Sequence, residues 1–176
     1  EDILCPALQL PGHVEAGRPY DLSLGAPLGE APIVAAALGW LGLAHGRLDR
    51  AAAAALFRSP YGPGRWVARA ALERTWLEAG RVDIFRDEAA RALTRVDAAA
   101  GAKLAAALAA SDLSRPHTAR EWVARWRAFL GGCGWPGEAP LAGAAYEGRE
   151  ALARMLDDFV RLDALAQVEQ AAQVPD

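Results

Sequence analysis

The spacing of apolar residues predicts helices along most of the chain after residue 31. From Pro32 to Ala44, apolar side chains recur every three or four positions, the period of an α-helix with one buried face. Pro32 suits a first helical turn, and His45-Gly46 ends the pattern. Asp49 is then expected to cap a second helix, Arg50–Phe57.

Five more helices follow in the same way. We expect them from Arg65 to Ala79, from Asp83 or Asp87 to about Val96, from Ala98 to Ala110, from Ala119 to about Leu130, and from about Gly143 to Ala166. Thr118 and Glu121 have the spacing of a capping box at the start of one of them. The residues expected to face the core are Val67, Ala71, Leu72 and Leu77 in the third helix and Leu152, Met155, Leu156, Phe159, Leu162 and Leu165 in the last.

Residues 1–26 have a different pattern. Proline and glycine interrupt them, and Tyr20-Asp21-Leu22-Ser23-Leu24 alternates apolar with polar side chains, which predicts a short strand. A second short strand is expected near Ala7–Leu10. The fold class predicted is all-α, an irregular bundle of about six or seven helices over residues 27–176. Residues 1–26 are expected to be an extended linker or the trailing edge of a preceding domain.

The composition and net charge of the chain argue against several classes of protein. The 176 residues are 53% hydrophobic and 23% charged, which favours a folded domain. The net charge of −3 argues against binding of nucleic acid by bulk electrostatics, although a local arginine patch remains open. No apolar run has transmembrane length and no signal-peptide pattern is present, so we expect a cytoplasmic protein without membrane contact. For Cys5 and Cys133, free thiols are favoured over a disulfide.

The sequence offers little for catalysis. It has no phosphate-binding glycine loop, and none of the histidines His13, His45 and His117 has a second ligand at metal-binding spacing. Asp157 and Asp158 are better explained as part of a solvated helix face than as a metal or acid–base pair. We therefore expect no catalytic residue, no metal and no cofactor in this chain.

One arginine cluster is a candidate contact surface. Arg58, Arg65 and Arg69 flank the turn-forming stretch Ser59–Gly64, and arginine binds phosphate well through paired hydrogen bonds. They form the candidate nucleic-acid-binding set, although pairing with acidic residues such as Glu73 is the favoured interpretation.

Six tryptophans add a second feature, because an exposed ring could stack on bases. Packing is the favoured role, and we expect Trp135 to fill the gap between two helices with its indole N–H bonded to a carbonyl.

Four segments follow one another along the chain: Arg18–Leu28, Ala31–Val34, Leu56–Tyr61, and Gly134–Leu141 with the helix through Leu165. In this order they resemble the AddB-like family of probable DNA-repair proteins, large helicase-nuclease-type chains with a PD-(D/E)XK nuclease domain. The resemblance implies an internal helical domain fragment, an inserted subdomain of a helicase-like region that follows a RecA-like domain. It implies a bacterial chain that acts in recombinational repair with a partner helicase subunit, on DNA.

No catalytic residue is carried over from that family, because the chain has no segment that matches its nuclease motif, and Cys5 and Cys133 cannot supply an iron–sulfur cluster. The function expected is a non-catalytic domain that braces the core and guides DNA. The alternative is a stand-alone α-helical protein-interaction module.

Overall fold

The computed structural model describes residues 27–111, 113, 115, 117–141 and 143–163. Within these residues, seven α-helices and one small sheet form the fold, which confirms the all-α prediction. The elements are a 3-10 turn η1 (Leu28–Glu30), α2 (Pro32–Ala44), β1 (Arg47–Asp49), α3 (Arg50–Arg58), α4 (Trp66–Glu78), β2 (Asp83–Phe85), α5 (Arg86–Val96), α6 (Ala98–Ala110), α7 (Ala119–Cys133) and α8 (Ala144–Val160). The strands expected at Ala7–Leu10 and Tyr20–Leu24 lie outside the described residues.

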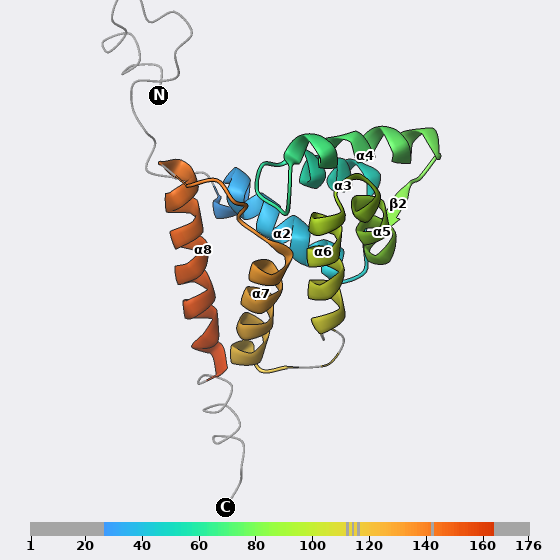
Figure 1. Cartoon of the computed structure of the whole chain (residues 1–176). Helices are drawn as coiled ribbons and strands as arrows, with labels where there is room; N and C mark the ends of the chain where they lie inside the picture. The colour runs from blue at the N-terminus through green and yellow to red at the C-terminus, as the bar shows by residue number, and fades with distance from the viewer. Residues whose placement is uncertain (1–26, 112, 114, 116, 142, 164–176) are drawn as a thin grey trace, which may run out of the picture.

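Helix α2 is the central element of the bundle. It contacts α3, α7 and α8, while α5 packs on α6, α6 on α7, and α7 on α8 (Figure 1). Its buried side chains lie on about half of its circumference and are Ile33, Val34, Ala36, Ala37, Trp40, Leu43 and Ala44. No residue from Pro32 to Ala44 is polar, and a helix that is apolar on every side is typical of the interior of a domain. None of the described helices is long and apolar enough to cross a membrane.

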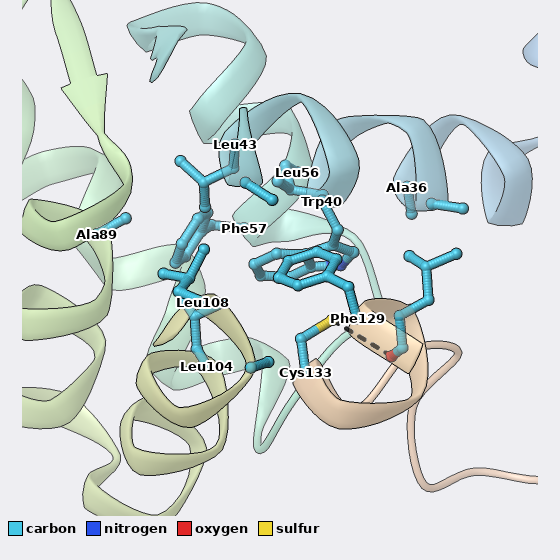
Figure 2. Packing of buried hydrophobic residues seen from close by; sticks show 14 of the residues in the cluster. Ala36, Trp40, Leu43, Leu56, Phe57, Ala89, Leu104, Leu108, Phe129 and Cys133 are labelled. Atoms are coloured by element: carbon cyan, nitrogen blue, oxygen red, sulfur yellow. Dashed lines mark hydrogen bonds between the residues drawn. The ribbon is translucent and has the colours of Figure 1, made fainter. Parts of the chain in front are cut away.

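Aromatic rings form the middle of the core. Figure 2 shows Trp40 near Phe57 and, on α7, Cys133. The ring centroids of Trp40 and Phe57 are 5.2 Å apart, and Phe57 meets Trp76 edge-to-face at 5.1 Å. Tilted and edge-on pairs at these distances are the favourable aromatic geometries. The core therefore joins α2, α3 and α4 through one row of rings.

Side-chain caps fix several helix starts where the sequence placed them. Asp49 accepts a hydrogen bond from the Ala52 N–H at 2.9 Å, and Asp97 accepts one from the Ala100 N–H at 3.0 Å. Thr118 and Glu121 form the predicted capping box at the start of α7. Each cap satisfies backbone donors that the first helical turn leaves without a partner.

The small sheet corrects one prediction. Asp83 was a candidate helix start, but it lies in β2, which pairs antiparallel with β1 so that Leu48 faces Ile84. Ile84 is fully buried in the core. Helix α5 therefore begins at Arg86, after the strand. Two three-residue strands far apart in sequence pair here because Ile84 gains burial.

Two predicted helix faces also need correction. On α4, Val67 and Leu77 are exposed to 56% and 59%, whereas Arg69 and Trp76 are buried beside Leu72. On α8, Leu152 and Leu156 are buried as predicted, but Met155 and Leu162 are about half exposed. Leu165 lies outside the described residues. Helix α7 also continues past the predicted end at Leu130 to Cys133.

Helices α5 and α6 approach each other closely at Gly101. A Cβ atom at this position would lie 2.4 Å from the Thr94 main-chain nitrogen and Cα. Thr94 lies on α5, so the contact is between the two helix backbones. Only glycine fits between them, which explains the glycine inside the alanine-rich helix α6.

Helices α7 and α8 are joined at one end by a carboxylate. Asp163, just after α8, accepts from the Ala119 and Arg120 N–H groups at 2.6 and 2.8 Å. Midway along the pair, Arg127 donates to Asp157 at 2.8 Å. The free amides of the α7 N-terminus are thus satisfied by a residue 43 and 44 positions further along the chain.

Candidate functional site

The three candidate arginines lie around the Ser59–Gly64 loop, but they do not form one exposed patch. Arg69 is fully buried. Its guanidinium donates to the main-chain carbonyls of Ser59, Pro63 and Gly64, the last at 2.7 Å. Arg69 therefore holds the loop from inside and presents no donor to a DNA phosphate, which corrects its place in the candidate binding set.

Burial lowers the pKa of Arg69 from its ordinary value, and the charge of Asp97 acts in the opposite direction. Its Nε has no hydrogen-bond partner among the described residues. Arginine nevertheless keeps its charge inside proteins, so three carbonyl oxygens and a nearby carboxylate compensate the guanidinium. A side chain held in this way is structural.

Arg58 and Arg65 remain at the surface. Arg58 is paired with Glu73 at 3.0 Å, the partner that the sequence suggested. Arg65 makes no ion pair within the part of the chain that the structure describes, and its N–H lies 3.4 Å from the Asp97 carboxylate. Trp66, the next residue, is 56% exposed. An exposed ring next in sequence to an exposed arginine is an arrangement that can stack on a base and contact a phosphate.

Asp97 links this surface to α6. Its pKa lies below the ordinary value, chiefly because the Ala100 N–H donates to the charged carboxylate; the N–H and the charge of Arg65 add to the effect. Asp97 thus caps α6 and also anchors the end of the Ser59–Gly64 loop. The hydrogen bonds of the Asp97 carboxylate therefore stabilise the conformation at the end of the Ser59–Gly64 loop, and they place an acidic side chain next to Arg65.

The Ser59–Gly64 loop is packed directly on the core tryptophan. The Trp40 indole donates to the Tyr61 carbonyl at 2.9 Å. A Cβ atom at Gly62 would lie 2.6 Å from the Trp40 ring, so no larger residue fits without a shift. Two prolines, Pro60 and Pro63, restrict the backbone on either side. The loop is therefore a fixed lid over Trp40.

The loop between α7 and α8 meets this lid. A Cβ atom at Gly137 would lie 3.1 Å from the Pro60 carbonyl oxygen, and one at Gly134 would lie 3.3 Å from Pro63. The Trp135 indole donates to the Ile33 carbonyl at 3.0 Å, as the sequence suggested for this side chain. We call this meeting of the Ser59–Gly64 loop, the Gly134–Gly137 loop and the first turn of α2 the loop junction.

The loop junction brings together three of the four segments that carry the family resemblance. Ala31–Val34 contributes the Ile33 carbonyl, Leu56–Tyr61 contributes the lid, and Gly134–Leu141 contributes Trp135. Of the first segment, Arg18–Leu28, only residues 27 and 28 are described. Segments far apart in sequence thus meet through indole N–H groups that donate to main-chain oxygens.

Titratable side chains do not converge on a chemical site in the described residues. No group of three or more His, Cys, Asp or Glu side chains there could hold a metal ion. Asp157 pairs with Arg127 and Asp158 with Arg161, which is the solvated face expected from the sequence. Cys133 is a buried free thiol, and burial raises its pKa to about 11. Cys5 and His13 lie outside the described residues.

The two described histidines are aromatic partners. His45 and His117 lie 6.0 and 5.0 Å from the Trp122 ring. Trp122 stacks on Trp126 at 5.7 Å, and Trp126 lies 5.7 Å from Phe159 of α8. The row of rings therefore runs from the start of α7 across to α8.

This row borders a surface feature that the sequence did not indicate. An apolar groove of about 570 Å³ lies between the second half of α2, α7 and the second half of α8. Its main apolar lining is Leu38, Leu41, Trp126, Met155, Phe159 and Leu162. The exposure of Leu38, Met155 and Leu162, between 44% and 48%, is the observation that reveals it. We call it the apolar groove.

Comparison of the chain with known proteins found no related protein. No protein-family model, curated protein or solved structure matches the chain.

Proposed function

We propose that this chain is a non-catalytic helical domain of a bacterial helicase-nuclease-type protein of DNA repair and recombination, similar to the AddB-like family. Its role is to brace the helicase-like core of the parent protein and to guide DNA. The observation that carries the proposal is the loop junction, because three of the four family-like segments meet there. Segments that recur in order across a family and meet in space have a shared structural task.

The chemistry of the loop junction supports a bracing role. Trp40, Trp135 and Arg69 place their polar atoms on main-chain carbonyls, and none of these three is directed at a solvent-filled site with other titratable groups. Such contacts fix the relative positions of helices and offer no acid, base or nucleophile. In a multidomain protein, a rigid helical body of this kind maintains the spacing between its neighbours.

The reading frame of the gene tests the identity of the parent. Under the proposal, the gene encodes a much longer chain that ends in a domain with an Asp followed by an Asp/Glu-x-Lys motif. The same gene also encodes a RecA-like domain upstream of residue 1. A gene that begins and ends with these 176 residues would overturn the proposal.

The DNA part of the proposal rests on Arg58, Arg65 and Trp66. We propose a titration of duplex and single-strand-tailed DNA at low salt, followed by fluorescence anisotropy. The double variant Arg58→Ala/Arg65→Ala should weaken binding and reduce the slope of log K against log salt by up to about 2, since each phosphate contact contributes about one unit. Trp66→Ala should weaken binding to the tailed DNA more than to the duplex, because only unpaired bases can stack.

The matched control is Arg74→Ala/Arg154→Ala, which removes the same charge from two exposed positions elsewhere. Equal losses in both double variants would show that net charge alone is responsible. No binding at about 100 μM, the weak end of non-specific DNA affinity, would exclude the DNA role while leaving the bracing role in place.

The apolar groove favours a second candidate, a stand-alone α-helical protein-interaction module. Exposed apolar patches rimmed by polar residues are typical of protein-binding surfaces. If the chain is such a module, the reading frame should end with this chain, and the groove should be empty in the purified protein.

A further inference from the structure

We infer that Trp66 and Val67 form a platform that stacks on one unpaired base of single-stranded DNA, an inference that rests on the proposed function. All six tryptophans lie in the described part of the chain, and among them Trp66 alone is more than half exposed, at 56%. Val67, beside it in the first turn of α4, is exposed to the same extent. A tryptophan ring left at the surface in this way offers a large apolar face to a ligand.

The charges around this platform favour stacking over contact with the DNA backbone. Arg58 is held by Glu73 at 3.0 Å, and Arg69 is buried against main-chain carbonyls. Of the three candidate arginines, only Arg65 makes no ion pair within the described residues, and its N–H lies 3.4 Å from the Asp97 carboxylate. The phosphate backbone therefore gains few contacts here, and the exposed ring is the larger source of affinity.

The size of the platform fits one base. On the exposed side of α4, the residues that follow Val67 are small or charged, namely Ala71, Arg74 and Glu78. The next large exposed apolar side chain on this helix is Leu77, ten positions further along, about 15 Å at 1.5 Å per residue. A stable protein interface covers about 800 Å² on each partner, whereas a base presents a single flat face. Two adjacent apolar side chains therefore match a base better than a protein partner.

The loop behind the platform holds it in place. Arg69, three positions after Trp66 on α4, donates to three carbonyls of the Ser59–Gly64 loop. Gly64 has no room for a side chain, since a Cβ atom there would collide with the Asp97 carboxylate. A ring on a fixed support loses little conformational freedom when a ligand binds. Because every base has a flat π-face, such a platform accepts any sequence.

Hairpin DNAs that differ only in the bases of a single-stranded tail test the inference. One has a full oligothymidine tail, one has an abasic tail of the same length, and one has an abasic tail with a single central thymine. Fluorescence anisotropy measures the binding of the 176-residue chain to each hairpin. The single thymine should tighten binding about fivefold to a hundredfold over the abasic tail, and the full tail should add only a few-fold more. Since all the tails carry the same phosphates, the ratio should not change with salt.

Three variants connect the effect to the platform. Trp66→Ala should abolish the difference between the abasic tail and the single-thymine tail, whereas Trp66→Phe retains a ring and should keep most of it. Leu77→Ala is the matched control, because it removes a side chain that is 59% exposed on the same helix. It should leave the difference unchanged. Circular dichroism checks that each variant keeps its helical content.

Several outcomes would overturn the inference. Equal binding of the abasic and single-thymine tails would do so and leave the DNA role in place, because phosphate contacts would then be responsible. So would a difference that survives in Trp66→Ala, or one that needs the full tail. A dimer that Trp66→Ala dissociates in sedimentation would assign the platform to a second copy of the chain. No binding to any tail at about 100 μM would remove the DNA role and the inference together.

Discussion

The indole N–H of Trp135 donates to the main-chain carbonyl of Ile33 at 3.0 Å, across 102 positions of sequence. This bond ties the loop between α7 and α8 to the first turn of α2. Replacing Trp135 with Phe keeps a ring but removes the donor, so we expect the free energy of unfolding to fall by about 1 to 2 kcal/mol. Urea denaturation followed by circular dichroism measures the change.

Trp66→Phe is the control for this prediction, because Trp66 is 56% exposed. It should change the free energy of unfolding by less than about 0.5 kcal/mol. If both variants are equally stable, the bond between Trp135 and Ile33 contributes nothing to the fold.

Arg69 is predicted to be one of the most sensitive positions in the chain. Arg69→Met fills a similar volume but leaves the Ser59, Pro63 and Gly64 carbonyls without their shared donor. We expect a loss of about 3 kcal/mol or more in the free energy of unfolding, because buried polar groups would lose charged partners. Arg69→Lys should also destabilise, since an ammonium cannot reproduce the planar fork of the guanidinium.

Arg74→Met is the matched control on the same helix. Its side chain is 84% exposed and pairs only with Glu78 at i,i+4 within the described residues. A change below about 0.5 kcal/mol is expected there. A similar small change for Arg69→Met would show that the loop does not depend on the guanidinium.

Asp97 should make stability depend on pH in the acidic range. Its pKa is lower in the folded chain than in the unfolded chain, so its stabilisation is complete above the unfolded value, about 3.9, and is lost as the pH falls through the folded value. Asp97→Asn keeps a side-chain cap for α6 but does not titrate. The stability difference between wild type and Asp97→Asn should therefore shrink as the pH is lowered below about 4.

Thermal unfolding at several pH values between neutral and acidic measures this difference. A difference that stays constant over the whole range would mean that the charge of Asp97 makes no contribution, and that capping alone explains its position.

Cys133 should be nearly inert to thiol reagents in the folded chain. Its thiol is fully buried, and burial raises its pKa to about 11. In a Cys5→Ser background at pH 8, labelling should be about a hundredfold slower than in denaturant, since little of the reactive thiolate is present. Equal rates with and without denaturant would show that the end of α7 opens readily.

Replacing Gly101 or Gly131 with alanine is predicted to change the free energy of unfolding in opposite directions. In Gly101→Ala, a methyl group would lie 2.4 Å from the Thr94 backbone, so the chain should lose about 1 to 3 kcal/mol despite the better helix propensity of alanine. In Gly131→Ala, a Cβ atom meets nothing within 4 Å, and a gain of up to about 1 kcal/mol is expected. Chemical denaturation of both variants checks the signs, and a stabilised Gly101→Ala would contradict the close contact of α5 and α6.

Local signals explain which elements could be predicted from the sequence. Some features depend on residues within a few positions of one another, so the local sequence pattern predicted them. These are the bounds of α2 and α6 and the caps at Asp49 and Thr118. The pairing of β1 with β2 was missed because each strand has three residues, too few for a periodic pattern.

The burial of Arg69 could not be read from the chain either. The sequence placed it in a candidate contact surface with Arg58 and Arg65, and only the Ser59–Gly64 loop supplies the carbonyls that compensate its burial. Val67 and Leu77 are exposed for the same reason, because α4 turns its arginine inward. The apolar groove was hidden by a similar effect: the stripe on α8 was assigned to the core, whereas part of it faces outward.

The carboxylate of Asp163 has a consequence for how the bundle opens. An isolated helix frays from its ends, but the end of α8 is bonded to the first amides of α7, and its start follows the loop that Trp135 fixes to α2. The C-terminal end of α8 therefore cannot loosen without breaking its bonds to the first turn of α7. In hydrogen exchange, the amides of α8 should therefore behave as one cooperative unit that is released together with α7.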